Sequence, residues 1–214
     1  MVKNPILIRG IFIASLLWFL MFAEFTTIGN IIHNTYFWIA MTASASFLAV
    51  YSVVTQKTEF KNLLTINKKF ILIGITHAVV LYGLSRFGVY IAQNLFDFVV
   101  PQIEAIYSTR SQMDDLYIGL LLIFLIGPAE EIFWRGFVQN KLEVVTNPTK
   151  AFIITTAIYA LVHIWAFNPM LMFAALVLGV HWGLMFKKYK SIVPGVISHA
   201  LWDAMIFVIF PIQF

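Results

Sequence analysis

The sequence predicts an all-α integral membrane protein, a polytopic bundle of seven transmembrane helices. Of its 214 residues, 61% are hydrophobic and only 11% are charged, and the mean hydropathy is +0.87. Soluble domains carry about 25% charged residues, so this composition favours a chain embedded in a bilayer. Apolar runs of about 20 residues, the length that crosses a bilayer, recur along the chain. We predict a single domain, 1–214, with N-terminal spans over 1–114 and a motif-bearing core over 115–211.

Seven apolar runs are separated by short polar stretches, of which 55–69 and 101–115 are the longest. The first run lacks a small-residue cleavage site and is expected to be retained as a span. The third run is too long for one straight span. It is expected to tilt, to kink near Gly83 or to continue as an interfacial helix, and an eighth span within it is the alternative. The predicted spans are 5–27, 36–54, 70–100, 116–138, 151–167, 169–186 and 192–210.

The basic residues gather in the loops on one side of these spans. If the N-terminus lies inside, the inner segments carry 11 of the 14 basic residues, and the outer loops carry only Arg110. Basic residues concentrate in the cytoplasmic loops of membrane proteins, so this bias predicts an inside N-terminus. It also explains the net charge of +4 without a nucleic-acid site. The inner basic residues are Lys3, Arg9, Lys57, Lys61, Lys68, Lys69, Lys141, Lys150, Lys187, Lys188 and Lys190, and the outer acidic residues are Glu24, Glu104, Asp114 and Asp115.

The stretch 127–138, GPAEEIFWRGFV, places three charged side chains inside an apolar run. A charged side chain in a membrane span costs roughly 3 kcal/mol even on the milder insertion scales, so these groups need a reason. In a helix, Glu131 and Arg135 lie on one face and are predicted to form an ion pair that supports the structure. Glu130 is rotated by about 100° from its neighbour and has no partner within the segment. We therefore assign the functional role to Glu130.

Two later spans contribute further buried polar groups. His163 follows Tyr159 by four residues, and His199 precedes Asp203 by four. At about 1.5 Å per residue from the nearest inner lysine, Glu130, His163 and His199 lie roughly 16, 20 and 13 Å deep. Polar groups at similar depths in neighbouring spans are expected to face the interior of the bundle and to meet there.

These groups suit hydrolysis of an amide bond without a covalent nucleophile. A lone carboxylate in an apolar site can take a proton from water near neutral pH, and a neutral histidine can orient that water. A second histidine, held by a carboxylate one turn on, can donate to an oxygen that becomes negative during acyl transfer. The chain has no cysteine, which excludes a disulfide framework, a thiolate zinc site and a cysteine nucleophile. Ser198 diverges from His199 on a helix, which argues against a serine mechanism.

Three motifs on successive spans resemble those of the CPBP intramembrane proteases, also called the CAAX protease and bacteriocin-processing (Abi) family, which includes the Ras-converting CAAX endopeptidases. EEIFWR at 130–135 matches EExxxR, and YALVH at 159–163 resembles FxxxH, with Tyr159 at the aromatic position. PGVISHALWDA at 194–204 resembles the third motif, a histidine followed four residues later by Asn or Asp. Gly179 and Gly183 resemble the small residues that precede that motif.

The resemblance implies that Glu130 activates water, assisted by His163, and that His199 and Asp203 form the oxyanion site. Asp203 departs from the asparagine of the CAAX endopeptidases. A carboxylate donates a hydrogen bond only when it is protonated, so we expect Asp203 to orient His199 instead. Members of this family are similar to glutamate proteases, in which a glutamate activates the water. We therefore predict no cofactor and no metal. Glu130, His163 and His199 are also ordinary zinc ligands, so a zinc site stands as the alternative.

The predicted function is that of an intramembrane endopeptidase acting on a membrane-associated peptide or a lipidated, CAAX-like protein tail. Two alternatives use the same polar cluster. One is a non-catalytic scaffold or bacteriocin-immunity protein, and the other is a proton-coupled transporter, for which buried Glu and His are also typical. The absence of an internal repeat counts against the transporter. Outside the site, His77 and Arg86 are expected to form a buried polar contact or an interfacial anchor, and His181 to line the entrance or contact lipid headgroups.

Overall fold

The structure is a computed structural model that describes residues 4–22, 36–56 and 60–214, and every regular element in these residues is a helix. Six helices are long and apolar enough to cross a membrane, which confirms the polytopic all-α fold. The helix at the seventh predicted span, Val193–Ile209, is apolar but shorter, so the seventh span stays a prediction. The six are α1 (Pro5–Phe22), α2 (Phe37–Thr55), α4 (Lys68–Gln93), the continuous helices Asp115–Val145 and Pro148–Ala166, and α10 (Pro169–Tyr189). Predictions that fall on Lys3, 23–27 and Lys57 lie outside the described residues.

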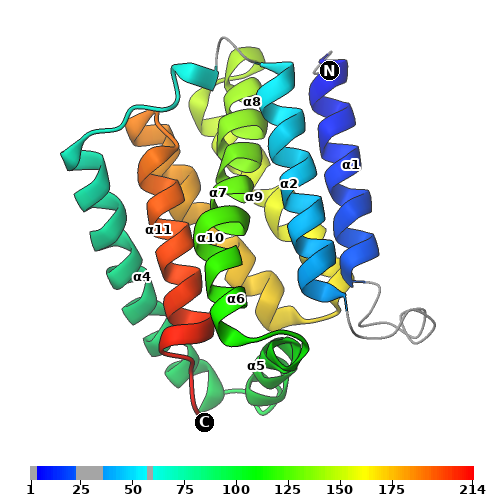
Figure 1. Cartoon of the computed structure of the whole chain (residues 1–214), viewed down its shortest axis with the longest axis vertical. Coiled ribbons are helices and arrows are strands. Elements are labelled where there is room, and N and C mark those ends of the chain that lie inside the picture. The colour runs from blue at the N-terminus through cyan, green and yellow to red at the C-terminus, as the bar shows by residue number, and fades with distance from the viewer. Residues whose placement is uncertain (1–3, 23–35, 57–59) are drawn as a thin grey trace.

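The long helices run side by side, and the chain ends at the opposite end of the bundle from where it begins (Figure 1). α11 (Val193–Ala204) packs along α4, α9 (Pro148–Leu161) packs along α10, and α1 packs along α2. Between them lies α7 (Gly127–Glu131), which carries the two adjacent glutamates and contacts both α2 and α11. The motif is therefore enclosed by helices from both halves of the sequence.

Several helix starts follow from side-chain capping. An Asn or Asp side chain at each start accepts a hydrogen bond from a backbone N–H of the first turn, which would otherwise lack a partner. In α9 and α10 a proline follows the cap directly, at the first helical position, where its missing N–H costs nothing. The capping residues are Asn67 for α4, Asp114 for α6 (Asp115–Leu121), Asn147 for α9 and Asn168 for α10.

The fourth predicted span, 116–138, ends too early. The helix runs unbroken from Asp115 to Val145 because no glycine or proline follows until Pro148 once the motif is passed. It is not uniformly α-helical: π-helical segments at Leu122–Ile126 and Ile132–Gln139 flank α7, and α8 (Asn140–Val145) completes it. Such π segments inside helices frequently occur at functional sites.

The predicted polar loop 101–115 is also wrong in part. α4 passes through Gly83 unbroken and ends at Gln93, and a separate helix, α5 (Val99–Ser108), follows it. α5 is amphipathic, with Val99 and Ile103 buried and Glu104 exposed. Pro101 is tolerated because it lies in the first turn, where its missing N–H costs nothing. α5 lies at the end of the bundle near the C-terminus (Figure 1).

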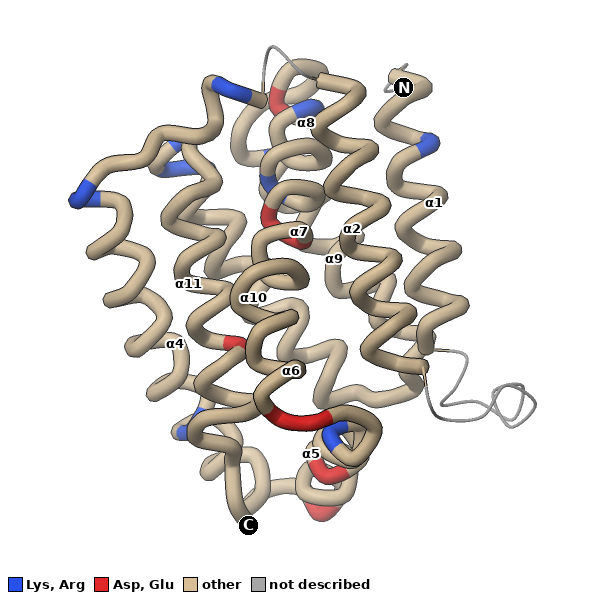
Figure 2. The backbone as a smooth tube through the Cα atoms, in the orientation of Figure 1, with Lys and Arg blue, Asp and Glu red and all other residues tan. Residues whose placement is uncertain are grey.

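Charge is distributed unevenly between the two ends. Figure 2 shows lysine and arginine gathered mainly at the end where the N-terminus and α8 lie, whereas acidic residues are frequent near α5. Arg110, just beyond α5, pairs with Asp115, and this hydrogen bond raises the pKa of Arg110 above its ordinary value. The described residues thus place the predicted inner and outer loops at opposite ends of the bundle.

Candidate active site

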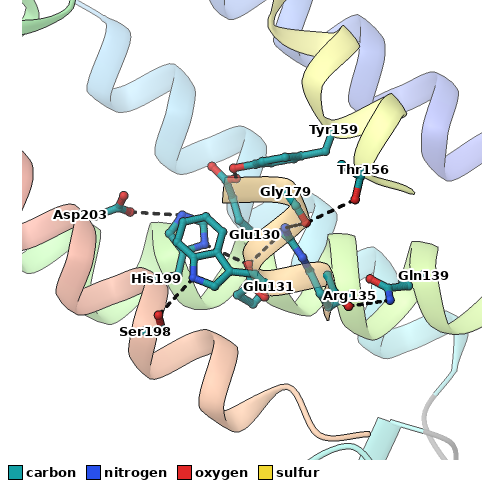
Figure 3. A network of polar contacts seen from close by, with 12 residues as sticks. Glu130, Glu131, Arg135, Gln139, Thr156, Tyr159, Gly179, Ser198, His199 and Asp203 are labelled. Carbon is teal, nitrogen blue, oxygen red and sulfur yellow. Dashed lines mark hydrogen bonds and ion pairs between the residues drawn. The ribbon is translucent and has the colours of Figure 1, made fainter. Parts of the chain in front are cut away.

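Glu130 and Glu131 are both buried in α7, with 5% and 0% of their surfaces exposed, but their contacts differ. Glu131 Oε1 accepts a hydrogen bond from Arg135 Nη1 at 2.8 Å, so the predicted ion pair is present. The same oxygen accepts a second hydrogen bond from His199 Nδ1 at 3.0 Å (Figure 3). Glu131 therefore joins its own helix to α11.

Two glycines permit this close approach of α7 and α11. A Cβ atom on Gly195 would lie 2.7 Å from Glu131 Oε2, and one on Gly127 would lie 3.0 Å from the Cα of Ala200. Both distances are shorter than packed atoms normally allow. Larger residues at these two positions would separate His199 from Glu131.

Arg135 is 1% exposed, and packed groups surround its charge. Besides Glu131, it lies 3.5 Å from the backbone oxygen of Gly179 through Nη2. Its guanidinium carbon lies 4.9 Å from the ring centre of Tyr159 and 5.5 Å from that of Trp182, distances typical of cation–π contacts. Arg135 thus ties the motif helix to α9 and α10.

Glu130 has a different neighbour. The hydroxyl of Tyr159 donates a hydrogen bond to Glu130 Oε2 at 3.0 Å (Figure 3). Among the described residues, no basic side chain forms an ion pair with Glu130, whereas Glu131 has two such neighbours. The unequal pairing predicted from the sequence is therefore a feature of the structure.

His199 lies between two carboxylates. Its Nδ1 faces Glu131, and its Nε2 lies 3.4 Å from Asp203 Oδ2. The ring stacks on Trp182, with centroids 3.7 Å apart and planes inclined by 15°. Because Nδ1 donates to Glu131, an Asp203 carboxylate can engage Nε2 only if a proton lies on one of the two groups. Asp203 is therefore placed to hold the ring of His199.

His163 is fixed as the Nδ1–H tautomer by two partners of defined polarity. Its Nδ1 lies 2.7 Å from the carbonyl oxygen of Tyr159, which can only accept a hydrogen bond. The indole of Trp18 can only donate, and its Nε1 lies 3.4 Å from His163 Nε2. His163 is thus bonded to neither Glu130 oxygen, and the two residues are connected through Tyr159.

A cavity of about 950 Å³ joins these groups, and its lining is predominantly apolar. All four predicted catalytic residues line it: Glu130, His163, His199 and Asp203. α4 and α10 form much of its wall, and α5 crosses one end with its apolar face inward. A cavity of this size with a few convergent polar groups has the form of a ligand-binding site.

The donor atoms of the site do not favour the zinc alternative. Both ring nitrogens of His163 and both of His199 are engaged by other protein groups, as described above. Over the described part of the chain, no group of three His, Asp or Glu side chains converges so as to hold a metal ion. The residues of the site therefore do not fit the predicted alternative of a zinc site held by Glu130, His163 and His199.

Several polar contacts were not foreseen from the sequence. The Tyr159 hydroxyl on Glu130 and the Trp18 indole on His163 are long-range contacts that no spacing reveals. His181 lines the cavity, and its Nε2 lies 3.2 Å from His77 Nδ1. His77 therefore makes a polar contact within the bundle, which is the first of the two roles expected for it. Ser198 Oγ accepts a hydrogen bond from the Trp182 indole, at 3.2 Å.

The comparisons with known proteins agree with the motifs. Residues 112–205 match the family model for type II CAAX prenyl endopeptidases, Rce1-like. Neither the search of curated proteins nor that of solved structures found a match. The matched segment contains Glu130, Glu131, Arg135, His163, His199 and Asp203. The resemblance is thereby confirmed: residues 112–205, which hold all three motifs, are similar to the Rce1-like CAAX prenyl endopeptidase family.

Proposed function

We propose that this protein is an intramembrane endopeptidase that cleaves the tail of a prenylated, CAAX-like protein or peptide. The observation that carries the proposal is the difference between the two glutamates. Glu131 is bonded to Arg135 and His199, whereas Glu130 lines an apolar cavity with only a tyrosine hydroxyl on one oxygen. A buried carboxylate that forms no ion pair is suited to take a proton from water.

The proposed reaction begins with a water molecule between Glu130 and the scissile carbonyl. Glu130 takes a proton from this water while the water oxygen bonds to the carbonyl carbon. The resulting oxyanion accepts a hydrogen bond from the Nε2–H of a protonated His199, a proton that it shares with Asp203 at 3.4 Å, while Trp182 stacks on the ring. The carbon–nitrogen bond then breaks, and the proton held by Glu130 passes to the leaving amine. His163 assists through Tyr159, whose carbonyl oxygen accepts from His163 Nδ1 and whose hydroxyl donates to Glu130.

The apolar lining of the cavity supports a lipidated substrate. A prenyl chain can pass from the bilayer into this cavity without exposing its methylene groups to water, which would cost roughly 0.8 kcal/mol each. The polar groups occupy one part of the wall, so a substrate can place its lipid among apolar residues and its peptide bond beside Glu130. A substrate class of this kind is also what the family name implies.

The first test is cleavage by the purified protein in liposomes. The substrates are a farnesylated CAAX peptide and the same peptide without the lipid, and release of a C-terminal fragment is followed by mass spectrometry. Wild type is expected to cleave the lipidated peptide faster, and Glu130→Ala to cleave neither. Glu143→Ala is the matched control, because Glu143 lies in α8 and pairs with Lys190 outside the cavity. Equal cleavage by Glu130→Ala and wild type would refute the proposal.

We also propose that the lysine-rich end of the bundle faces the inside of the cell. The chain contains no cysteine, so single-cysteine variants can be labelled without background. An impermeant maleimide added to intact cells is expected to label Ser111→Cys, near Arg110, and not Lys68→Cys, at the start of α4. Labelling of Lys68→Cys alone would reverse the orientation.

A further inference from the structure

We infer that the Tyr159 hydroxyl is a positioning group that fixes the Glu130 carboxylate for proton transfer; this rests on the proposed function. The hydroxyl occupies Oε2 at 3.0 Å. Among the described residues, no hydrogen bond reaches Oε1, which is therefore the oxygen left to accept the proton of the water. A carboxylate held at one oxygen cannot rotate freely about its last torsion, so the second oxygen keeps a constant direction.

The tyrosine ring is itself held on several sides. Tyr159 is 4% exposed, and its ring makes edge-on contacts with two other rings. Its ring centroid lies 5.3 Å from that of Trp134 and 5.1 Å from that of His163. The guanidinium of Arg135 lies over the ring. On a further side, a Cβ atom at Gly179 would lie only 3.1 Å from Tyr159 Cδ1, which shows how closely α10 approaches. The hydroxyl therefore has little freedom to leave Glu130.

Tyr159 also connects Glu130 to His163. Its side chain donates to Glu130, and its backbone carbonyl accepts from His163 Nδ1 at 2.7 Å. One residue thus sets the position of the carboxylate and the orientation of the imidazole. The direct bond to the carboxylate depends on the hydroxyl alone, whereas the bond to the imidazole depends on the backbone.

This division allows the hydroxyl to be removed on its own. Tyr159→Phe keeps the ring, its contacts with Arg135 and Trp134, and the backbone bond to His163. We expect kcat to fall about tenfold because the carboxylate loses its fixed direction. KM should stay within about twofold, because the hydroxyl is turned to Glu130 and the apolar lining is unchanged.

The matched control is Tyr51→Phe, which removes a hydroxyl of the same kind outside the cavity. That hydroxyl donates to the carbonyl oxygen of Ile6 at 2.8 Å and joins α2 to α1. Its loss should leave kcat and KM unchanged while lowering the thermal midpoint about as much as Tyr159→Phe does. A purely structural role for Tyr159 would make the two variants behave alike in the cleavage assay.

An infrared measurement tests the hydrogen bond without turnover. The difference spectrum of wild type minus Glu130→Gln identifies the carboxyl bands of Glu130, and these bands should shift in the Tyr159→Phe background. The inference is overturned if the bands do not move, or if Tyr159→Phe keeps full kcat while Glu130→Ala is inactive; the proposed function survives the second result. If Glu130→Ala is as active as wild type, both the inference and the proposed function fail.

Discussion

Glu130 and Glu131 are neighbours in α7, yet they face different surroundings. Glu131 is completely buried, bonded to Arg135 and His199, and in contact with the backbone of α11 at Gly195. Glu130 meets a tyrosine hydroxyl on one side and the cavity on the other. The same residue type thus serves packing on one face of the helix and faces the cavity on the other. The comparison predicts that the two residues fail in different ways when changed.

The largest effect on activity is expected from Glu130→Gln. Glutamine has nearly the same shape and can still accept a hydrogen bond from Tyr159, but it cannot take a proton from water. The cleavage rate should fall by about 10³-fold, within the range that a general base contributes. Thermal unfolding in detergent should stay within about 2 °C of wild type. A variant that retains a tenth of the wild-type rate would contradict the division between the two glutamates.

The complementary change, Glu131→Gln, is expected to act mainly on stability. It leaves the Arg135 charge buried without a counter-ion, and removing one partner of such a pair costs about 3–5 kcal/mol. Denaturant unfolding should report this loss, with a lower yield of folded protein.

The double variant Glu131→Gln, Arg135→Met removes the uncompensated charge along with its partner. It should recover part of the lost stability, because replacing a whole buried pair by neutral groups is often tolerated. If the double variant were less stable than Glu131→Gln alone, the ion pair would not be what makes Glu131 structural.

A smaller effect on activity is expected at Asp203, where this chain departs from the asparagine of the CAAX endopeptidases. In Asp203→Asn the side-chain oxygen can still accept a hydrogen bond from His199 Nε2–H and keep the ring in place, so the cleavage rate should stay within about tenfold. Asp203→Ala removes the contact and should lower the rate by about 10²-fold. Equal rates for the Asn and Ala variants would show that Asp203 does not orient His199.

Local sequence patterns predict one part of this structure and miss another. The apolar runs predict seven spans, of which six are long apolar helices in the described residues. The four-residue spacing of Glu131 and Arg135 predicts their ion pair, because helical periodicity places them on one face. The similar depths of Glu130, His163 and His199 also predict that they meet, and all three line one cavity. It could not identify Tyr159 or Trp18 as partners, because such contacts depend on how helices rotate against each other.

The error over 101–115 has a related cause. Pro101, Glu104 and the charges that follow resemble a loop, and α5 shows its amphipathic character only when its apolar residues are seen against the cavity. A half-buried helix at a membrane surface carries too little apolar sequence to be recognised as a span. For this reason the sequence predicts a loop where the helix that closes one end of the cavity lies.

The smallest expected effect compares two glycines of α4 and tests whether the cavity beside Glu130 holds the substrate. A Cβ atom on Gly83 or on Gly88 would meet no atom within 4 Å, but only Gly88 lines the cavity. Leucine at either position should be accommodated and should stabilise the helix slightly. Gly88→Leu should raise KM for the farnesylated peptide about fivefold, because its side chain occupies cavity volume, whereas Gly83→Leu should leave KM unchanged. If both variants bind the substrate as wild type does, the lipid is held elsewhere on the protein. The apolar cavity would then not support a catalytic role for Glu130.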